Sequence, residues 1–462
     1  MTRPRPSDSV RAIIESAVPS TRIETVSKIP TKRLLRAFKV KLTDERTLLL
    51  NLLPPPSRLL RYEKWFAQSE AVVVEWLLQD ACQQQNKGTQ CLDEKGAGAR
   101  PQGRSSMRQW TAQPASDTLP SVKGQLLSYL PTLIKHSSTS ETGSAFSLFE
   151  PTTGDPISSL GNPPTPMERR AIDFQKGCLI RRISNVTSPS GRFGQAATVL
   201  EQSRSPENNQ SAARETKLDL DGAHGWRKTF HLLLEAILRD GEDRAVTMSY
   251  ELVRMTFHKF AHLLDAVTIA RLVVCDADED DVVLVSRSEK AEKKREQREP
   301  ETSKGGPKAE LEPDDSVSAS QQNLEEDNAT ALEITGLQDW SNCIFGDPLF
   351  ATVFSHTTPE FERGDEDEEE EQHDINIIED PDNAPTRILL YECYHATVAI
   401  VRQFYRPEAD SSEREIAARR RLVAALAKLE HVDASEPAGK RPRQPSGDDW
   451  PVKRPRGDTP VL

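Results

Sequence analysis

Short apolar segments in the first eighty residues alternate between helical and strand periods. Apolar residues at three- and four-residue spacing predict a short helix over Ser7 to Val18, which Pro19 ends. Residues 34–42 alternate between apolar and basic positions, and Thr47 to Leu53 is an almost continuous apolar run that three prolines end. We therefore expect a hairpin with one buried strand, followed by one or two helices over Arg58 to Asp80.

The rest of the chain repeats these two patterns between polar segments. Alternating or β-branched apolar runs predict strands, and apolar stripes at helical spacing predict helices. Thr165 is placed to cap one helix, with Pro166 in its first turn. The expected strands are Gln125 to His136, Ala145 to Glu150, Arg271 to Val274, Val282 to Val285 and Ala331 to Leu337, and the expected helices are Pro166 to Ile183, Trp226 to Arg239, Asp243 to Leu264, Arg387 to Tyr405 and Ser411 to Leu429.

Several long segments hold few aliphatic residues, so they cannot bury enough apolar surface to offset the entropy of ordering. We expect disorder in residues 83–120, 201–222, 287–330 and 361–384, and in a tail over residues 431–462. The folded body is then shared among residues 1–82, 121–286 and 331–430.

Composition narrows the class of protein. Hydrophobic residues make up 36% of the 462 residues, below the ~45–50% that is typical of globular chains. With 60 Lys and Arg against 72 Asp and Glu, the net charge of −12 argues against direct nucleic-acid binding by the body. No apolar run approaches the ~18 residues of a membrane span, and the six cysteines include no C-x-x-C pair. We expect an intracellular protein that does not cross a membrane.

Two acid-bearing turns follow segments with the pattern of buried strands. Asp276 comes just after Arg271 to Val274, and Asp281 lies five residues further on, before the next apolar run. A loop of this length can direct both carboxylates toward one metal and phosphate site. Asp339 follows the strand expected at Ala331 to Leu337 in the same way. The alternative is that the residues around Asp276 form only an acidic, solvated turn.

At these turns the sequence resembles the aminoglycoside phosphotransferase family, with its choline-kinase-like relatives and its many fungal members. The family's catalytic loop, H-G-D-x-x-x-x-N, is similar to Val274 through Asp281. Its metal motif, G-x-x-D-W followed by G-D-P, is matched by Gly336 to Trp340 and Gly346 to Pro348. The resemblance spans roughly residues 34–429. It implies a two-lobed, protein-kinase-like α+β fold, with a β-rich small lobe and a mainly helical large lobe.

The resemblance divides the chain and assigns chemistry to it. Residues 1–82 would form the first part of the small lobe, residues 121–286 its remainder with the hinge, the first large-lobe helices and the catalytic-loop strands, and residues 331–430 the metal-motif strand and the last helices. It implies phosphoryl transfer from ATP, with Mg²⁺, to a hydroxyl of an unidentified small-molecule acceptor. Asp276 would accept the hydroxyl proton, Asp339 and Asp281 would hold magnesium, and the backbone around Glu150 would meet adenine.

Some positions depart from the family pattern. Asn51 stands where the family has a phosphate-binding lysine, so Glu70, which resembles that lysine's partner on the following helix, is expected to lack its partner. Val274 replaces the catalytic-loop histidine, and residues 28–36 contain no glycine. Two interpretations stay open. The chain is either a small-molecule kinase or a catalytically impaired pseudokinase that acts as a binding or scaffold module.

The tail carries two basic clusters, Lys440-Arg441-Pro442-Arg443 and Lys453-Arg454-Pro455-Arg456. Nine residues separate them, which is the arrangement of a bipartite nuclear-import signal. A nuclear import receptor is therefore an expected partner, and we expect a nuclear or cytoplasmic location, or both. The alternative is a solvated tail with chance basic clusters.

Overall fold

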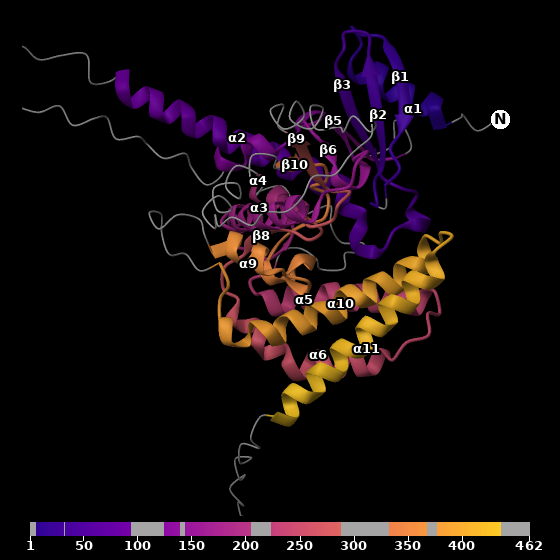
Figure 1. Ribbon diagram of the computed structural model, residues 1–462, viewed down its shortest axis with the longest axis vertical. Coiled ribbons are helices and arrows are strands. Elements are labelled where there is room, and N and C mark those ends of the chain that lie inside the picture. The colour runs from indigo at the N-terminus through magenta and orange to yellow at the C-terminus, as the bar shows by residue number, and fades with distance from the viewer. Residues whose placement is uncertain are drawn as a thin grey trace, which may run out of the picture.

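The computed structural model describes residues 6–31, 33–93, 124–138, 144–204, 223–287, 332–366 and 377–435. At one end lies an antiparallel five-stranded sheet in the order β1-β2-β3-β5-β4 (Figure 1). Its strands are β1 (Ile23–Lys28), β2 (Arg36–Leu42), β3 (Thr47–Leu52), β4 (Thr132–Ser137) and β5 (Phe146–Glu150). The other end is mainly helical (Figure 1), so the two-lobed α+β fold expected from the sequence is confirmed.

The β2–β3 hairpin shows why this sequence forms a two-faced sheet. Its strands pair from Arg36 with Leu52 to Lys41 with Thr47. Successive side chains of a strand point to opposite faces, so Leu48 and Leu50 face one way and Leu49 the other. Leu48 and Leu50 pack with the apolar side of α1 (Pro6–Ala17) in a core of their own, whereas Leu49 belongs to the main core. The same period places Asn51 on the inner face, beside Leu49.

The segment after β3 joins the sheet to the helical lobe. A 3-10 helix (Arg61–Trp65) leads into α2 (Phe66–Asp93). The Arg61 guanidinium contacts Asp240 at 2.5 Å, and Arg406 reaches both carboxylate oxygens of Glu63, at 2.6 and 2.7 Å. Both pairs bridge this segment and large-lobe helices, so α2 is held in a defined position under the sheet.

Two small antiparallel sheets lie where the lobes meet, in the orders β10-β9-β6 and β7-β11-β8. Val274, at the end of β8, pairs with Cys343, and Val283, at the start of β9, pairs with Leu337. The turn that joins β8 to β9 therefore lies beside the turn that joins β10 to β11. The strands are β6 (Asp155–Pro156), β7 (Gly194–Gln195), β8 (Arg271–Val274), β9 (Val283–Arg287), β10 (Leu332–Leu337) and β11 (Cys343–Gly346).

The large-lobe helices surround an aromatic core. Trp226, Phe230, Phe350 and Tyr391 pack with ring centroids 5.2 to 6.2 Å apart. One helix begins as its sequence predicts, because Thr165 and Glu168 form a reciprocal capping box. The helices are α3 (Pro166–Ser184), α4 (Ala196–Arg204), α5 (Trp226–Asp243), α6 (Tyr250–Phe260), α9 (Pro359–Glu366), α10 (Ala384–Tyr405) and α11 (Ser411–Ser435).

The structure corrects the expected extent of several segments. Helix α2 continues to Asp93, α4 covers residues 201–204 and α11 reaches Ser435, so these helices extend into segments where we expect disorder. Glutamine is a good helix former, which suits the Gln-rich end of α2. Helix α9 lies within the expected acidic insert, where Phe361 packs against Phe354 with ring centroids 5.7 Å apart, and Ile377 near the end of that insert is buried.

One expected strand is partly wrong. Residues 124–129 form a 3-10 helix (Gly124–Tyr129), with Leu126 in the core, and β4 starts only at Thr132. The remainder of the expected inserts, and the basic clusters of the tail, lie outside the described residues.

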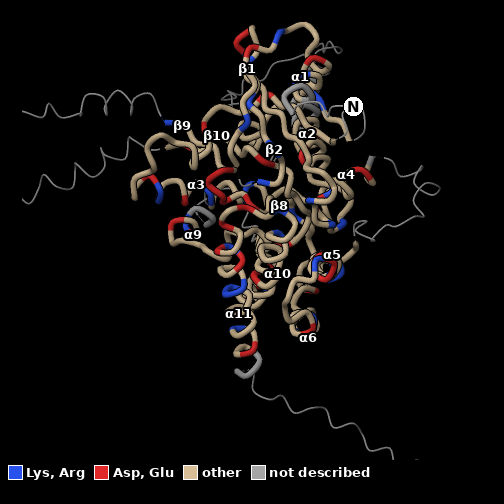
Figure 2. Tube along the Cα trace, turned by 90° about the vertical axis from the view of Figure 1, so that its right-hand side faces the viewer, with Lys and Arg blue, Asp and Glu red and all other residues tan. Residues whose placement is uncertain are grey.

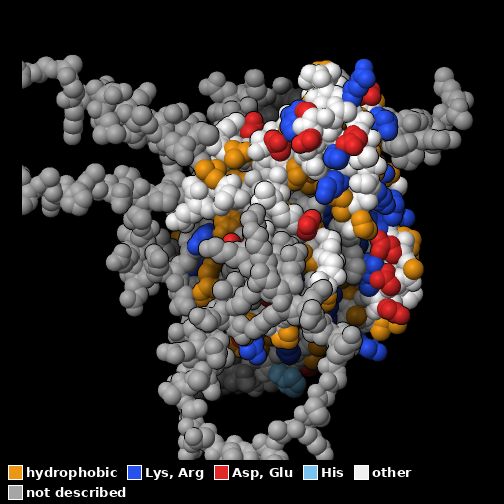
Figure 3. All heavy atoms as spheres, turned by 45° about the horizontal axis from the view of Figure 1, so that its top comes forward, with side chains coloured by type: hydrophobic (Ala, Val, Ile, Leu, Met, Phe, Trp, Pro, Cys, Tyr) orange, Lys and Arg blue, Asp and Glu red, His pale blue; other side chains and the backbone are white. Residues whose placement is uncertain are grey.

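The described surface mixes both signs of charge. Basic and acidic side chains alternate over the visible part of the small lobe (Figure 3). Acidic positions also lie in the middle of the molecule, near α3 and β8 (Figure 2). No helix in the described ranges combines the length and the apolar character needed to cross a membrane.

Candidate active site between the lobes

A cleft of about 370 Å³ lies between the five-stranded sheet and the large lobe. Its roof comes from β3 and the β1–β2 segment, and its floor from Leu284 of β9. The segment that leaves β5 closes one side. A volume of this size is within the range of small-molecule sites. The lining residues that matter below are Thr31, Leu49, Pro151, Thr152, Gly154, Asp281 and Gln338.

Glu150 is the last residue of β5, and Pro151 and Thr152 after it line the cleft. Glu150 is exposed. The structure therefore places the segment expected to meet adenine at the edge of the cleft. Gly154 has φ +105°, and a Cβ there would meet the backbone oxygen of Val285 at 2.9 Å, so this turn requires glycine.

Asn51 and Glu70 form a buried pair above the cleft. The Asn51 amide Nδ2 donates to Oε1 of Glu70 at 2.7 Å, and the two residues are 0% and 1% exposed. Glu70 therefore has a neutral hydrogen-bond donor where the family has its charged lysine partner. The amide is the right length to reach the carboxylate, but it is neutral. Burial, with the nearby Asp339 carboxylate, raises the pKa of Glu70 well above its usual range, while Arg33 and the Asn51 hydrogen bond oppose this.

Arg33 brings the positive charge that Asn51 does not supply. Its Nη1 lies 3.3 Å from Oδ2 of Asp339, and both side chains are 2% exposed. The same nitrogen donates to the backbone oxygen of Gln338 at 3.2 Å, and Nε donates to Oγ1 of Thr31 at 3.1 Å. Arg33 lies between β1 and β2, so a guanidinium from that connection reaches the acid at the end of β10.

Asp339 and Asp276 approach one another because their turns are neighbours. Oδ1 of Asp339 accepts from the backbone nitrogen of Ser341 at 2.8 Å. Oδ1 of Asp276 is buried and has no hydrogen-bond partner among the described residues. Burial, followed by repulsion from Asp339 and Glu279, raises the pKa of Asp276 well above its usual range. Asp276 therefore holds a proton to higher pH than an ordinary aspartate. Its Oδ1, called the vacant oxygen below, has no hydrogen-bond partner among the described residues.

The turn that carries Asp276 is held from three sides. Thr352 donates to the backbone oxygen of Cys275 at 2.8 Å and to Oδ1 of Asp278 at 2.7 Å. Lys176 donates to the backbone oxygen of Asp278 at 2.7 Å, and Arg169 grips both oxygens of Asp280 at 2.7 and 3.0 Å. These contacts fix the turn through Asp278 and Asp280, and none of them involves the side chain of Asp276.

Asp281 lies on the floor of the cleft, where Oδ2 accepts from Oγ1 of Thr31 at 3.1 Å. Asp281 and Asp339 are the carboxylates expected to hold magnesium. No three acidic, histidine or cysteine side chains of the described ranges come close enough to form a metal site by themselves. Mg²⁺ commonly takes one or two carboxylates and completes its shell with phosphates and water. Asp281 and Asp339 fit this preference of Mg²⁺, although Arg33 already contacts Oδ2 of Asp339.

Asp347, in the Gly346-Asp347-Pro348 motif, has a structural role. Its Oδ2 accepts from the Tyr391 hydroxyl at 2.7 Å and lies 3.2 Å from Nε of Arg387, and all three residues are buried. Oδ1 accepts from the backbone nitrogen of Leu349 at 3.1 Å and caps the next 3-10 helix. A Cβ on Gly346 would meet the Trp226 ring at 2.5 Å. This half of the motif anchors β11 to α10.

A second hollow, of about 170 Å³, lies on the large-lobe side of Asp276. Apolar and aromatic side chains line much of it, and Arg402 of α10 and Arg421 of α11 contribute positive charge. The residues that line it include Tyr62, Phe66, Asp276, Glu279, Asn342, Phe350, Tyr394, His395, Arg402 and Arg421.

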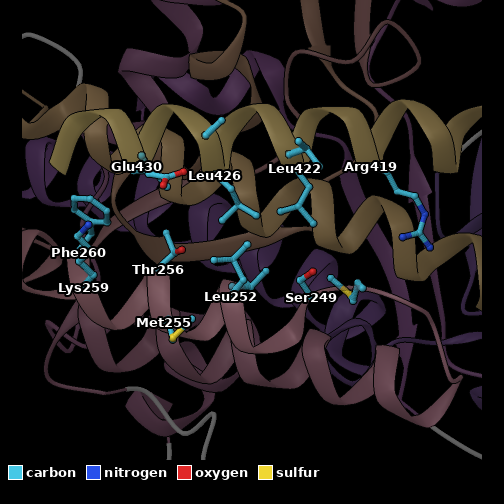
Figure 4. Close-up of a pocket in the computed structure, with 15 residues that line it drawn as sticks. Ser249, Leu252, Met255, Thr256, Lys259, Phe260, Arg419, Leu422, Leu426 and Glu430 are labelled. Atoms are coloured by element: carbon cyan, nitrogen blue, oxygen red, sulfur yellow. The ribbon is translucent and has the colours of Figure 1, made fainter. Parts of the chain in front are cut away.

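A third hollow, of about 550 Å³, is a groove between α6 and α11. Leu252 and Leu422 point into it from opposite helices (Figure 4). Its lining comes from α6, α11 and the residues beside α6, and Asp276 and Asp339 do not take part in it.

Sequence reasoning missed Arg33, Arg402, Arg421 and His395. Arg33 lies in a segment without a recognisable motif, and the other three lie on helices whose apolar stripes predict only packing. The sequence signal that points to Arg33 is the neutral Asn51 at the position of a phosphate-binding lysine. Another residue then has to supply the positive charge.

Comparisons with known proteins complete the description. No protein-family profile matches the chain, and no curated protein sequence matches it significantly. A protein assigned as a fructosamine-3-kinase from Thermobifida fusca is similar in structure, with 11% identity, a TM-score of 0.46, and coverage of 91% of this chain and 99% of that one. The aminoglycoside phosphotransferase APH(4)-Ia gives 12% identity, a TM-score of 0.43, and coverage of 91% and 98%.

Macrolide 2'-phosphotransferase type I is a third similar structure, with 11% identity, a TM-score of 0.41, and coverage of 93% and 99%. These proteins carry the names of small-molecule kinases and phosphotransferases, the group that the sequence motifs resemble. At these identities and TM-scores the likeness carries no argument about this chain, and the chemistry of the site rests on its own residues.

Proposed function

We propose that the chain is a kinase-like phosphotransferase that moves the terminal phosphoryl group of ATP to a hydroxyl of a small molecule. The supporting observation is the position of Asp276. Its vacant, buried oxygen faces no protein donor in the described part of the chain, and it lies where the turn after β8 meets Asp339. A carboxyl of raised pKa at such a point suits a general base for a hydroxyl.

The proposed step balances in atoms and charge. The acceptor oxygen forms a bond to the γ-phosphorus, and the bond from that phosphorus to the oxygen bridging it to the β-phosphate breaks, which releases ADP. The hydroxyl proton passes to the vacant oxygen of Asp276. The cleft of about 370 Å³ would hold the nucleoside, with adenine beside Pro151 and Thr152.

The phosphates require positive charge, because Glu70, Asp276 and Asp339 place three carboxylates near one guanidinium. Asp339 and Asp281 are the residues that would hold Mg²⁺. A bound Mg²⁺ would neutralise charge on the β- and γ-phosphates. The Arg33 guanidinium contacts Oδ2 of Asp339, the same oxygen that would face Mg²⁺. When Mg²⁺ binds, Arg33 would either move away from this carboxylate or contact a phosphate.

A second candidate is a nucleotide-binding module without turnover, the pseudokinase interpretation. Two observations favour it. Asn51 gives Glu70 a neutral partner, and Arg33 already pairs with Asp339. In this case ATP would bind and Asp276 would have no chemical role.

One experiment on the full chain separates these candidates. We would measure ATP affinity by calorimetry with Mg²⁺, and ADP formation with water as the acceptor. The phosphotransferase proposal expects saturable binding in wild type and Asp276→Asn, with ADP formation at least ~100-fold slower in the variant. The matched control is Asp280→Asn, because Asp280 lies in the same turn but pairs with Arg169. Binding with equal ADP formation in all three proteins would favour the module, and no binding would contradict both.

A further inference from the structure

The hollow beside Asp276 has features that define what it can hold. Its volume of about 170 Å³ equals roughly six water molecules, at ~30 Å³ each. Tyr62, Phe66, Phe350 and Tyr394 supply aromatic walls. A ligand that fits is therefore a small molecule of few heavy atoms, and it would lie beside Asp276, which lines the hollow.

Two arginines of the hollow are unpaired within the described ranges. The guanidiniums of Arg402 and Arg421 make no ion pair within 4 Å, and no hydrogen bond, with any described residue. Two other arginines of helix α11, and the one that follows α10, are engaged at 2.6 to 2.8 Å, whereas Arg420 of α11 makes no such pair with a described residue. These pairs are Arg406 with Glu63, Arg414 with Glu408, and Arg419 with Glu415.

Glu279 is the acid that opposes these arginines. It lies within electrostatic reach of Arg402 but beyond ion-pair distance. Because no ion pair forms at this distance, Glu279 leaves the guanidinium donors of Arg402 and Arg421 available to a ligand.

His395 adds a neutral hydrogen-bonding group. Its Nε2 lies 2.8 Å from the backbone oxygen of Phe350. A carbonyl oxygen only accepts, so Nε2 carries the hydrogen and Nδ1 is left as an acceptor. Burial lowers the pKa of His395 to about 4, which keeps the ring uncharged at neutral pH.

We infer that this hollow takes a small anion that carries a hydroxyl group, with its carboxylate or phosphate at Arg402 and Arg421 and its hydroxyl toward Asp276. The inference rests on the proposed function, because it makes this anion the phosphoryl acceptor. Arginine is suited to bind carboxylate and phosphate groups through charge-assisted hydrogen bonds. The same charge disfavours a cationic acceptor of equal size.

The test uses four probes that share a three-carbon skeleton. Glycerate carries a carboxylate, glycerol 3-phosphate a phosphate, glycerol no charge, and 3-aminopropane-1,2-diol a cation. Dissociation constants would be measured by saturation-transfer NMR on the full chain without nucleotide. We expect one or both anions to bind at least ~10-fold more tightly than glycerol, and the cation to bind more weakly than glycerol. The two anions distinguish a carboxylate site from a phosphate site.

Three variants assign the effect to this hollow. Arg402→Gln and Arg421→Gln should each weaken anion binding about tenfold or more, since each removes a charged donor. The matched control is Arg420→Gln, because Arg420 is an exposed arginine of the same helix that does not line the hollow. Unfolding curves would confirm that all three variants fold, and Arg421 is itself exposed, so its variant is the safer of the two.

The outcomes separate this inference from the proposed function. Anion binding that depends on Arg402 and Arg421 supports the inference, whether or not ATP binds. Equal binding of anion, glycerol and cation, or anion binding that survives both substitutions, would overturn it. Absence of anion binding in a protein that binds ATP would overturn it too, and would leave the phosphotransferase proposal standing.

Discussion

Asn51 of β3 donates a 2.7 Å hydrogen bond to Glu70 of α2, and both side chains are buried. The pair keeps the geometry of a contact between the sheet and the helix, but it contains one negative charge and no positive one. Arg33, which reaches in from the β1–β2 connection to Asp339, supplies the positive charge instead.

Asn51→Lys should tighten ATP binding about tenfold, because an ammonium group then faces both Glu70 and the phosphate region. The measurement is calorimetry with ATP and Mg²⁺. Asn51→Gln is the control, since it keeps a neutral amide at nearly the same length. Equal ATP affinity in the two variants would show that charge at this position has no part in binding.

Glu70→Gln should change how stability depends on pH. The raised pKa of Glu70 means that the folded protein keeps this proton to a higher pH than the unfolded chain, whose carboxyl titrates near 4.5. The stability that the proton provides is present at low pH and is lost as pH rises above 4.5 toward the folded pKa. We therefore expect the variant to be more stable than wild type at pH 8, with a smaller difference at pH 5.

Urea unfolding at the two pH values measures this effect. Glu75→Gln, on the same helix, serves as the control substitution. A difference that grows toward pH 5 would mean that Glu70 is held in its charged form.

Arg33→Gln should increase the affinity of the nucleotide-free protein for Mg²⁺, because the substitution releases Oδ2 of Asp339 from its guanidinium partner. Calorimetric titration with magnesium chloride measures the change, and Lys28→Gln, at the exposed end of β1, is the control. Asp339→Ala should abolish the gain when it is combined with Arg33→Gln. Unchanged Mg²⁺ affinity in Arg33→Gln would show that Asp339 is not a metal ligand.

Arg387→Met should lower the free energy of unfolding by about 3–5 kcal/mol, because it leaves the buried Asp347 carboxylate without its charged partner. Arg414→Gln removes a more exposed pair with Asp410 and should cost less than about 1 kcal/mol. Urea denaturation of both variants checks the contrast. Similar losses in the two variants would remove the anchoring role assigned to Asp347.

The spacing of apolar residues predicts the large-scale architecture, because burying one face of a helix or strand requires that spacing. The β2–β3 hairpin and the main helices follow from alternation and from apolar stripes. Strand β1 was not predicted, because its residues Ile23–Lys28 are half-buried or exposed at an edge of the sheet. Strand β11 was missed because Cys343–Gly346 has only four residues. Its position depends on pairing with β8, which is distant in sequence.

A motif marks the two turns of the candidate site in the sequence. The turns that carry Asp276 and Asp339 lie side by side because β8 and β9 pair with β11 and β10. The contact of Arg33 with Asp339 joins residues 306 positions apart in a loop without a motif, and no local pattern encodes it. The hydrogen bond from Asn51 to Glu70 was not predicted, because only the charge of the residue at position 51 was considered and not its reach as a donor.

The central claim is that ATP occupies the cleft between the sheet and the large lobe. Photolabelling of the full chain with 8-azido-ATP, followed by peptide mapping, tests it most directly. We expect saturable labelling of peptides that contain Pro151 to Gly154 or Leu284, removed by excess ATP, because these residues line the cleft where adenine would lie. Labelling that ATP does not displace, or that falls on the α6–α11 groove instead, would contradict the claim.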